Sequence, residues 1–266
     1  MTSSIDVNVP SVARMYDYLL DGKDSYPADQ QACEELLKTV PSMKALALNN
    51  REFLRRVVRT LAQDYGIRQF VDHGSGLPTR DNVHQVAQAV HEDARVVYID
   101  DDPIVLAHGR ALLQEDLSTT VIQADMRDTD AIFDHPETQR LIRPDEPTAA
   151  LFVSVMHCIP DHEENGPAQV LERVKARLAP GSFLVVCQLV SPRPDIRDSV
   201  TEFMRESTGD HWGRVREEAD VEGYLHGLEI VPPGLVEVSQ WRRDNDLLPR
   251  QESFEWSEFG GVARLP

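Results

Sequence analysis

The sequence contains little cysteine, no long apolar run and no leader-like pattern in its first residues. Its three cysteines, Cys33, Cys158 and Cys187, are far apart and form no Cys-x-x-Cys pair, which argues against a disulfide framework and a structural zinc site. The most apolar stretch, Phe183 to Val190, is interrupted by Gln188 and is too short to cross a bilayer. Because the first residues also lack a basic and apolar targeting pattern, we expect a cytoplasmic protein with no membrane partner.

Positive charge is also scarce. Lysine and arginine together number 27 against 45 aspartate and glutamate residues, so the formal net charge is −18. Such a field repels phosphate backbones, and we therefore expect no nucleic-acid partner. The 266 residues are 41% hydrophobic and 27% charged, which is ordinary for a globular chain that buries a core.

The pattern of the chain changes once, near residue 66. Before this point we expect three amphipathic helices: one that follows Ser11 and ends at Gly22, one that stops at Pro41, and one with an apolar stripe from Phe53 to Leu61. After it, short apolar runs alternate with helix-length segments, which predicts a parallel sheet covered by helices on both faces. The expected strands are 69–71, 95–99, 120–123, 149–153 and 182–189, and the expected helices are 82–91, 103–114, 128–142 and 167–178.

This alternation stops after Ser191. We expect a charged helix over 195–206 and a short acidic helix over 215–224. Two further strand candidates, Leu235–Trp241 and Gly260–Leu265, follow at the C-terminal end. They would add an antiparallel edge to the sheet.

An acid and two glycines follow the first predicted strand, at the strand end where ligands bind in open parallel sheets. The segment is Asp72-His73-Gly74-Ser75-Gly76, and its glycines let the backbone turn tightly and approach a ligand. The nicotinamide fingerprint needs a third glycine where Thr79 stands, a P-loop needs a lysine after the glycines, and a nucleophile elbow around Ser75 needs glycines at 73 and 77. An ordinary glycine turn between strand and helix is the alternative.

Two more acids follow the next two predicted strands. Asp100 lies 24 residues beyond Gly76, near the spacing of roughly 20 at which an acid accepts hydrogen bonds from ribose hydroxyls. Asp125 precedes Met126, so a carboxylate and an apolar side chain together suit an adenine ring. Each acid alone could cap a helix, as we expect of Asp102 before Pro103. The three motifs in this order form one set.

This set resembles the cofactor face of class I S-adenosylmethionine-dependent methyltransferases over about residues 66–190. A narrower resemblance covers nearly the whole chain, to the signature of an actinobacterial family of S-adenosyl methyltransferases formerly described only as a domain of unknown function. It is carried by Ala13–Asp29, Gly74–Thr79, His157–Asp161 and Gly260–Arg264. The chain departs from the signature at Asp21, where a second glycine is expected, and at His73 inside the glycine motif.

The resemblance implies a Rossmann-like α/β sheet of seven strands, one of them antiparallel. It places a methyltransferase domain over 67–266 beneath an N-terminal helical cap over 1–66. It also implies S-adenosylmethionine as the cofactor, with the Gly74 to Gly76 backbone at its methionyl part, Asp100 at the ribose, and Asp125 and Met126 at the adenine. The remaining expected cofactor-binding residues at the strand ends are Asp72, Ser75, Asp101 and Ser154.

The polar and aromatic residues of the first helix are expected to belong to a lid over the cofactor. Arg14 or Lys23 would meet the cofactor carboxylate, and Tyr16 would stack near the methyl group. A solvated helix face is the alternative interpretation of these residues.

His157, which follows the fourth strand, is the candidate general base, because histidine titrates near neutrality. The alternative is that it packs or bonds backbone in its loop. Asp161 is expected to cap a helix or hold that loop, and the neighbouring acids lack the paired histidines of a specific metal site, so we expect no metal. Trp212 and Met204 would either line an acceptor pocket or belong to the core.

The predicted function is therefore methyl transfer from S-adenosylmethionine to an O, N or C atom of a small-molecule acceptor. The alternative from another class is a non-catalytic protein that senses S-adenosylmethionine or S-adenosylhomocysteine through the same residues. A nicotinamide-dependent oxidoreductase is disfavoured by Pro78 and Thr79 in the glycine turn. The sequence identifies neither the acceptor nor an oligomeric state.

Overall fold

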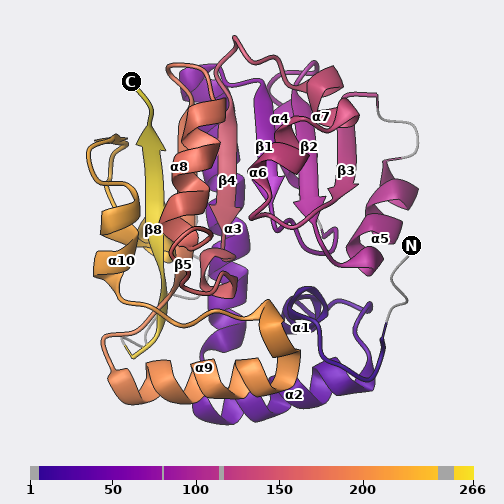
Figure 1. Ribbon diagram of the computed structural model, residues 1–266, viewed down its shortest axis with the longest axis vertical. Helices are drawn as coiled ribbons and strands as arrows, with labels where there is room; N and C mark the ends of the chain where they lie inside the picture. The colour runs from indigo at the N-terminus through magenta and orange to yellow at the C-terminus, as the bar shows by residue number, and fades with distance from the viewer. Residues whose placement is uncertain (1–5, 80, 114–116, 245–254) are drawn as a thin grey trace.

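The computed structural model describes residues 6–79, 81–113, 117–244 and 255–266 (Figure 1). The strands are β1 (Gln69–His73), β2 (Arg95–Asp100), β3 (Thr119–Gln123), β4 (Ala149–Val153), β5 (Phe183–Val190), β6 (Glu229–Ile230), β7 (Val236–Glu237) and β8 (Ser257–Arg264). The α-helices are α1 (Val12–Leu19), α2 (Pro27–Thr39), α3 (Met43–Tyr65), α4 (Val83–Gln88), α5 (Pro103–Leu112), α6 (Thr129–Phe133), α7 (Pro136–Leu141), α8 (Pro167–Arg177), α9 (Pro194–Thr208) and α10 (Glu218–Tyr224). Short 3-10 turns are η1 (Met156–Cys158), η2 (Gly209–His211) and η3 (Val238–Gln240). None of the helices in the described ranges combines the length and apolar character that a membrane span requires.

The described strands form one sheet in the order β3-β2-β1-β4-β5-β8-β6, with β7 also paired to β8. Strands β1 to β5 run parallel, so their carboxyl ends lie at one edge. Strand β8 runs antiparallel to its neighbours β5, β6 and β7. The mixed, mostly parallel α/β sheet is thus confirmed, with eight strands instead of seven because β6 and β7 both pair with β8.

Helices cover both faces of the sheet, as the unbroken burial of β1 and β5 requires. On one face, α3 and α4 pack around Phe53, Phe70 and Trp241. On the other, α6, α7, α8 and α10 pack around Val71 and Phe152. Neighbouring residues Phe70 and Val71 serve opposite faces because successive strand side chains alternate.

A separate apolar cluster forms a cap at the carboxyl-end edge. There α1 and α2 pack against α9 around Met15, Leu36, Met204 and Trp212. Figure 1 shows α1 just below the strand ends, with α2 and α9 side by side beneath it. The cap therefore combines both halves of the sequence, while much of α3 packs on the sheet. A domain boundary at 66–67 stays a prediction.

Two expected elements differ in the structure. The segment 128–142, expected as one helix, is split into α6 and α7, because Pro136 lacks the N–H that would continue α6 and instead begins a new helix. The strand expected over Leu235–Trp241 is wrong beyond the two residues of β7, since the chain turns at once into η3, where the Glu237 side chain accepts a hydrogen bond from the Ser239 N–H.

The end of α1 also differs from the expectation. Asp21, not Gly22, takes the left-handed conformation, with φ of 60°. A Cβ atom on Gly22 would lie 2.0 Å from Oδ1 of Asp17, so glycine is needed here for close packing. The Asp17 carboxylate in turn accepts the backbone N–H of Asp24 at 2.9 Å, which helps to turn the chain toward α2.

Candidate functional site

A cavity of about 430 Å³ lies between the carboxyl ends of the parallel strands and the cap. Every expected cofactor-binding residue except Lys23 lines it: Arg14, Tyr16, Asp72, Gly74, Ser75, Gly76, Asp100, Asp101, Asp125, Met126 and Ser154. The structure therefore brings together one site from four strand ends and the first helix. Lys23 is exposed and lies outside the cavity lining, so its expected contact with a cofactor carboxylate is not supported.

The glycine turn after β1 is built for close approach. Gly74 and Gly76 have φ of 66° and 67°, which side chains rarely adopt. A Cβ atom on Gly74 would lie 2.7 Å from Cγ1 of Val155, whereas one on Gly76 would meet no atom within 4 Å. The turn is held by Asp100, whose Oδ2 accepts the Gly76 N–H at 2.8 Å.

Two buried carboxyl groups line the cavity beside this turn. Burial raises the pKa of Asp72 to about 7, against a lowering by the charge of Arg51. Burial also raises the pKa of Asp100 to about 7, although the Asp102 and Gly76 N–H groups lower it. Within the described residues the side chain of Asp72 makes no hydrogen bond, and each carboxylate oxygen of Asp100 accepts one. These acceptors suit the ammonium and ribose hydroxyl donors of S-adenosylmethionine.

The end of β3 carries the third motif. Nε of Arg127 donates to both carboxylate oxygens of Asp125, at 3.0 Å to Oδ1 and 2.9 Å to Oδ2, and Nη2 donates to Oδ2 at 2.6 Å. Burial would raise the pKa of Asp125, but these hydrogen bonds and the Arg127 charge lower it, so the group stays ionised. Met126 packs toward the glycine turn, with its Cε 3.6 Å from where a Gly74 Cβ would lie. An apolar surface and an acceptor thus stand side by side, as an adenine requires.

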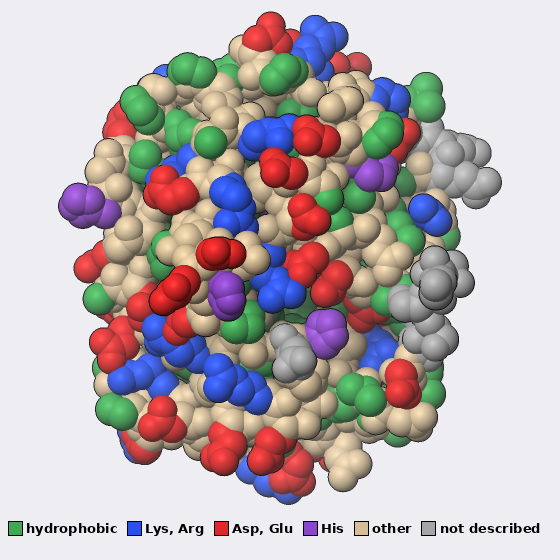
Figure 2. Space-filling model, in the orientation of Figure 1, with side chains coloured by type: hydrophobic (Ala, Val, Ile, Leu, Met, Phe, Trp, Pro, Cys, Tyr) green, Lys and Arg blue, Asp and Glu red, His purple; other side chains and the backbone are tan. Residues whose placement is uncertain are grey.

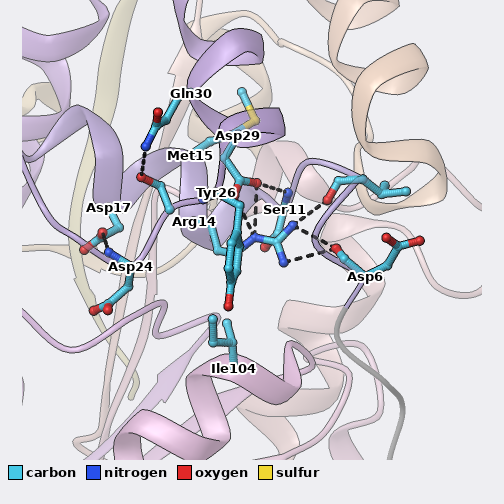
Figure 3. Close-up of polar contacts among 12 residues, drawn as sticks. Asp6, Ser11, Arg14, Met15, Asp17, Asp24, Tyr26, Asp29, Gln30 and Ile104 are labelled. Atoms are coloured by element: carbon cyan, nitrogen blue, oxygen red, sulfur yellow. Dashed lines mark hydrogen bonds and ion pairs between the residues drawn. The ribbon is translucent and has the colours of Figure 1, made fainter.

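Arg14 lines the cavity, but its guanidinium group is occupied by the cap itself. Nε lies 3.0 Å from Oδ2 of Asp29, and both terminal nitrogens donate to the carbonyl of Asp6, at 3.3 Å. Arg14 also donates to the carbonyl of Val9 and lies 5.2 Å from the ring centre of Tyr26 (Figure 3). These contacts tie the N-terminal segment to α2, and they do not support the expected contact between Arg14 and a cofactor carboxylate.

Tyr16 is also held by protein contacts. Its hydroxyl donates to the carbonyl of Ala47 at 3.1 Å and accepts from Nδ2 of Asn50 at 2.8 Å. Burial raises the pKa of Tyr16, so the phenol stays neutral. The residue lines the cavity, as expected, with its ring fixed between α1 and α3.

His157 does not line the cavity. Its buried ring accepts the Leu189 N–H on Nδ1 at 3.3 Å and lies 4.7 Å from the Trp212 ring, and burial with the nearby Arg216 charge lowers the pKa of His157 to about 3. A neutral, enclosed ring of this kind supports the packing interpretation and argues against His157 as the general base. Asp161 holds the same loop, because it pairs with Arg214 and Arg216.

Trp212 and Met204 belong to the apolar core of the cap and do not line the cavity. Among the described residues, no group of three or more histidine, cysteine, aspartate or glutamate side chains is arranged to hold a metal ion. Of the two interpretations given for Trp212 and Met204, the structure supports the packed core.

Sequence reasoning missed three polar residues at this site. Asn50 and Arg51 line the cavity from α3, where they look like the polar flank of an amphipathic helix. Glu258, the second residue of β8, accepts a hydrogen bond from Ser154 in the cavity wall. The one available signal for Glu258 was the prediction of an antiparallel strand beside β5, which places the start of β8 at the end of β5.

Comparisons with known proteins agree with this architecture. The sequence matches the family described as S-adenosyl methyltransferase over residues 1–266. A crystal structure from Thermobifida fusca YX, assigned as a methyltransferase, is 40% identical, covers 98% of this chain and 96% of that one, and has a TM-score of 0.89. A DUF574 family protein from Streptomyces avermitilis MA-4680 is 33% identical, with 99% and 100% coverage and a TM-score of 0.90.

More distant structures share the fold. The methyltransferase CalH, solved with S-adenosylhomocysteine, is 14% identical, covers 95% of this chain and 72% of that one, and has a TM-score of 0.52. No curated protein matches the sequence. Because the family match extends over the cap as well as the sheet, the chain belongs to the S-adenosyl methyltransferase family and is an enzyme that uses S-adenosylmethionine as its methyl donor.

Proposed function

We propose that the enzyme methylates a small-molecule acceptor inside the capped cavity. One observation carries this proposal: Pro10 and Tyr16 of the cap line the same 430 Å³ cavity as Gly76 and Asp100 of the strand ends. Cavities of this size take small ligands. The net charge of −18 also opposes a nucleic-acid acceptor, and Figure 2 shows acidic and basic side chains intermingled on one face of the molecule.

Bound S-adenosylmethionine supplies an electrophilic methyl group on a positively charged sulfur. In this proposal Asp100 accepts hydrogen bonds from the ribose hydroxyls, and Asp125 and Met126 hold the adenine. Asp72 faces the ammonium of the methionyl part, with Arg51 beside it to pair with the carboxylate. Each assignment matches a donor with an acceptor already present in the cavity wall.

The cap contributes by excluding water and by holding the acceptor against the methyl group. Ser11 connects cap and sheet directly, because its hydroxyl donates to Asp102, the residue that caps α5. The compartment we propose is the cytoplasm. Cys33, Cys158 and Cys187 are all free thiols, as is usual under reducing conditions.

The test is calorimetric titration of the protein with S-adenosylmethionine, S-adenosylhomocysteine and NAD. We expect the first two to bind and NAD not to bind. In Asp100→Asn both affinities should fall by about 10- to 100-fold, because a hydrogen bond to a charged group contributes about 1.5–3 kcal/mol. Asp198→Asn, an exposed site on α9, is the matched control and should bind like the parent.

The acceptor class is tested separately. The enzyme is incubated with S-adenosylmethionine and either the filtered small-molecule fraction or the retained macromolecules of a cell extract, and S-adenosylhomocysteine is measured. Formation dependent on the small-molecule fraction is expected. Formation only with macromolecules, or binding of both cofactor forms without any transfer, would contradict the proposal.

A further inference from the structure

Ser154 stands in the cavity wall in a strained conformation. It follows the last residue of β4 and has φ of 60°, in the left-handed region that residues with a Cβ atom rarely adopt. Such strain persists where surrounding structure enforces it, and it occurs often at functional sites. Its hydroxyl lines the cavity on one side and donates to Oε1 of Glu258 on the other.

Glu258 is a carboxylic acid enclosed in the sheet. It is 2% exposed and lies opposite Leu189 in the antiparallel register of β5 and β8. Strand β8 approaches β5 closely here, because a Cβ atom on Gly260 would lie 2.0 Å from the carbonyl oxygen of Val186. The close pairing of β8 with β5 therefore holds the Glu258 carboxyl group within hydrogen-bond distance of the Ser154 hydroxyl.

The second oxygen of Glu258 has spare capacity. Oε2 is buried and makes no hydrogen bond to any residue that the structure describes. An unsatisfied buried polar atom destabilises the folded state. A purely structural role is thus a poor explanation, since an uncharged side chain would bond to Ser154 without burying a second acceptor.

Several titratable groups surround this acid. Cys187 on β5 donates its thiol to Oδ1 of Asn50 at 3.2 Å, and its pKa is raised by burial and by Glu258. Glu237 on β7 acts on Glu258 through its charge, and Glu258 in turn acts on Tyr16 and Cys158. Burial raises the pKa of Glu258 to about 8, against a lowering by the Ser154 hydrogen bond and by the adjacent Cys187 thiol.

We propose that Ser154 and Glu258 form a relay that takes the proton from a hydroxyl or amine acceptor during methyl transfer, an inference that rests on the proposed function. As the acceptor's lone pair bonds to the methyl carbon, the carbon–sulfur bond breaks and its electron pair stays on sulfur, which becomes neutral. The acceptor's proton passes to Oγ of Ser154, whose own proton passes to the carboxylate of Glu258. This acid then carries the proton that His157, outside the cavity, does not take.

The test uses the charge difference between two ligands. S-adenosylmethionine carries a positive sulfur and S-adenosylhomocysteine does not, while the groups that meet Asp72 and Asp100 are the same in both. A positive charge near Glu258 lowers its pKa and expels a proton. Calorimetry in buffers of different ionisation heat counts the protons released by each ligand. At about pH 8 we expect S-adenosylmethionine to release about 0.4 proton more than S-adenosylhomocysteine does, for a shift of about one pKa unit.

Three variants test whether Glu258 is the source of this difference in proton release. Glu258→Gln should bind both ligands and show no difference in proton release. Glu237→Gln, a matched glutamate in the same sheet that also bonds a serine, Ser239, should keep the difference. Ser154→Gly suits the positive φ and should fold even if Glu258→Gln does not. In Ser154→Gly the difference should reach its maximum at higher pH, because the Glu258 carboxylate has lost its hydrogen-bond donor.

Equal proton release by the two ligands in the parent protein would overturn the relay. So would a difference that persists in Glu258→Gln, or a pH maximum that Ser154→Gly does not move. If neither ligand binds the parent protein, the proposed function itself fails, which is a separate outcome.

Discussion

Buried charged residues lie on two sides of the cavity, in the cap and at the strand ends, and they differ in their hydrogen-bond partners. In the cap, Arg14 and Asp29 are almost fully enclosed, and their hydrogen bonds are made to each other and to the cap backbone. At the strand ends, the side chain of Asp72 makes no hydrogen bond within the described residues, and Asp100 accepts one on each carboxylate oxygen. Both pairs are buried, yet only the second keeps acceptors available.

The difference separates residues that hold the site from residues that meet the ligand. A buried charge without partners is destabilising, so its retention needs a reason outside the folded chain. Burial raises the pKa values of Asp72 and Asp100, because the nearby Arg51 charge and the backbone hydrogen bonds to Asp100 only partly offset the loss of solvent. Exposure alone would not have separated the two groups, because Arg14 and Asp72 both line the cavity.

The largest effect is expected in the cap. Arg14→Met leaves Asp29 buried without its cation, and breaking a buried ion pair in this way costs about 3–5 kcal/mol. Urea unfolding of the protein without ligand measures the loss. Lys38→Met is the matched control, because Lys38 pairs with Glu35 at the surface, where ion pairs contribute about 0–1 kcal/mol. Equal losses in the two variants would show that the Arg14 contacts do not hold the cap.

At the strand ends the expected effect depends on pH. Asp72 is an acid with a raised pKa, so between its ordinary value of 3.8 and about 7 the folded state binds more protons than the unfolded state. Stability therefore falls as pH rises through this window. Asp72→Asn removes this pH dependence. The free energy of unfolding of the variant, minus that of the parent, should therefore be larger by about 3–4 kcal/mol at about pH 8 than at about pH 4.

Urea unfolding at both pH values measures this gain. Taking the difference between parent and variant cancels the contributions of Asp100 and Glu258, whose raised pKa values act in the same direction, and of His73 and His157, whose lowered values act in the opposite one. Asp198→Asn should show no gain. A variant gain that is the same at both pH values would mean that Asp72 is not charged and buried in the free protein.

The grouping of the acids at the strand ends could be predicted from the sequence. The contacts that the cap residues make with one another could not. Parallel strands place their carboxyl ends at one edge, so the sequence alone predicts that Asp72, Asp100 and Asp125 lie together. No such rule applies to α1, where the partners of Arg14 depend on how α2 folds back. Glu258 was missed because its place follows from the antiparallel pairing of β8, which brings a strand start to the edge where the other strands end.

The smallest effect concerns which basic side chain pairs with the carboxylate of S-adenosylmethionine. Lys23 is one of the two residues, with Arg14, predicted to meet a cofactor carboxylate. It is exposed and outside the cavity, whereas Arg51 lines the cavity and its charge acts on Asp72. Lys23→Ala should leave the calorimetric affinity for S-adenosylmethionine within about twofold, because an exposed charge contributes little. Arg51→Gln should lower it about tenfold, which corresponds to about 1.5 kcal/mol, the lower end of the range for a hydrogen bond to a charged group. The reverse order would place the methionyl carboxylate under the end of α1, and the cap would then bind ligand as well as cover it.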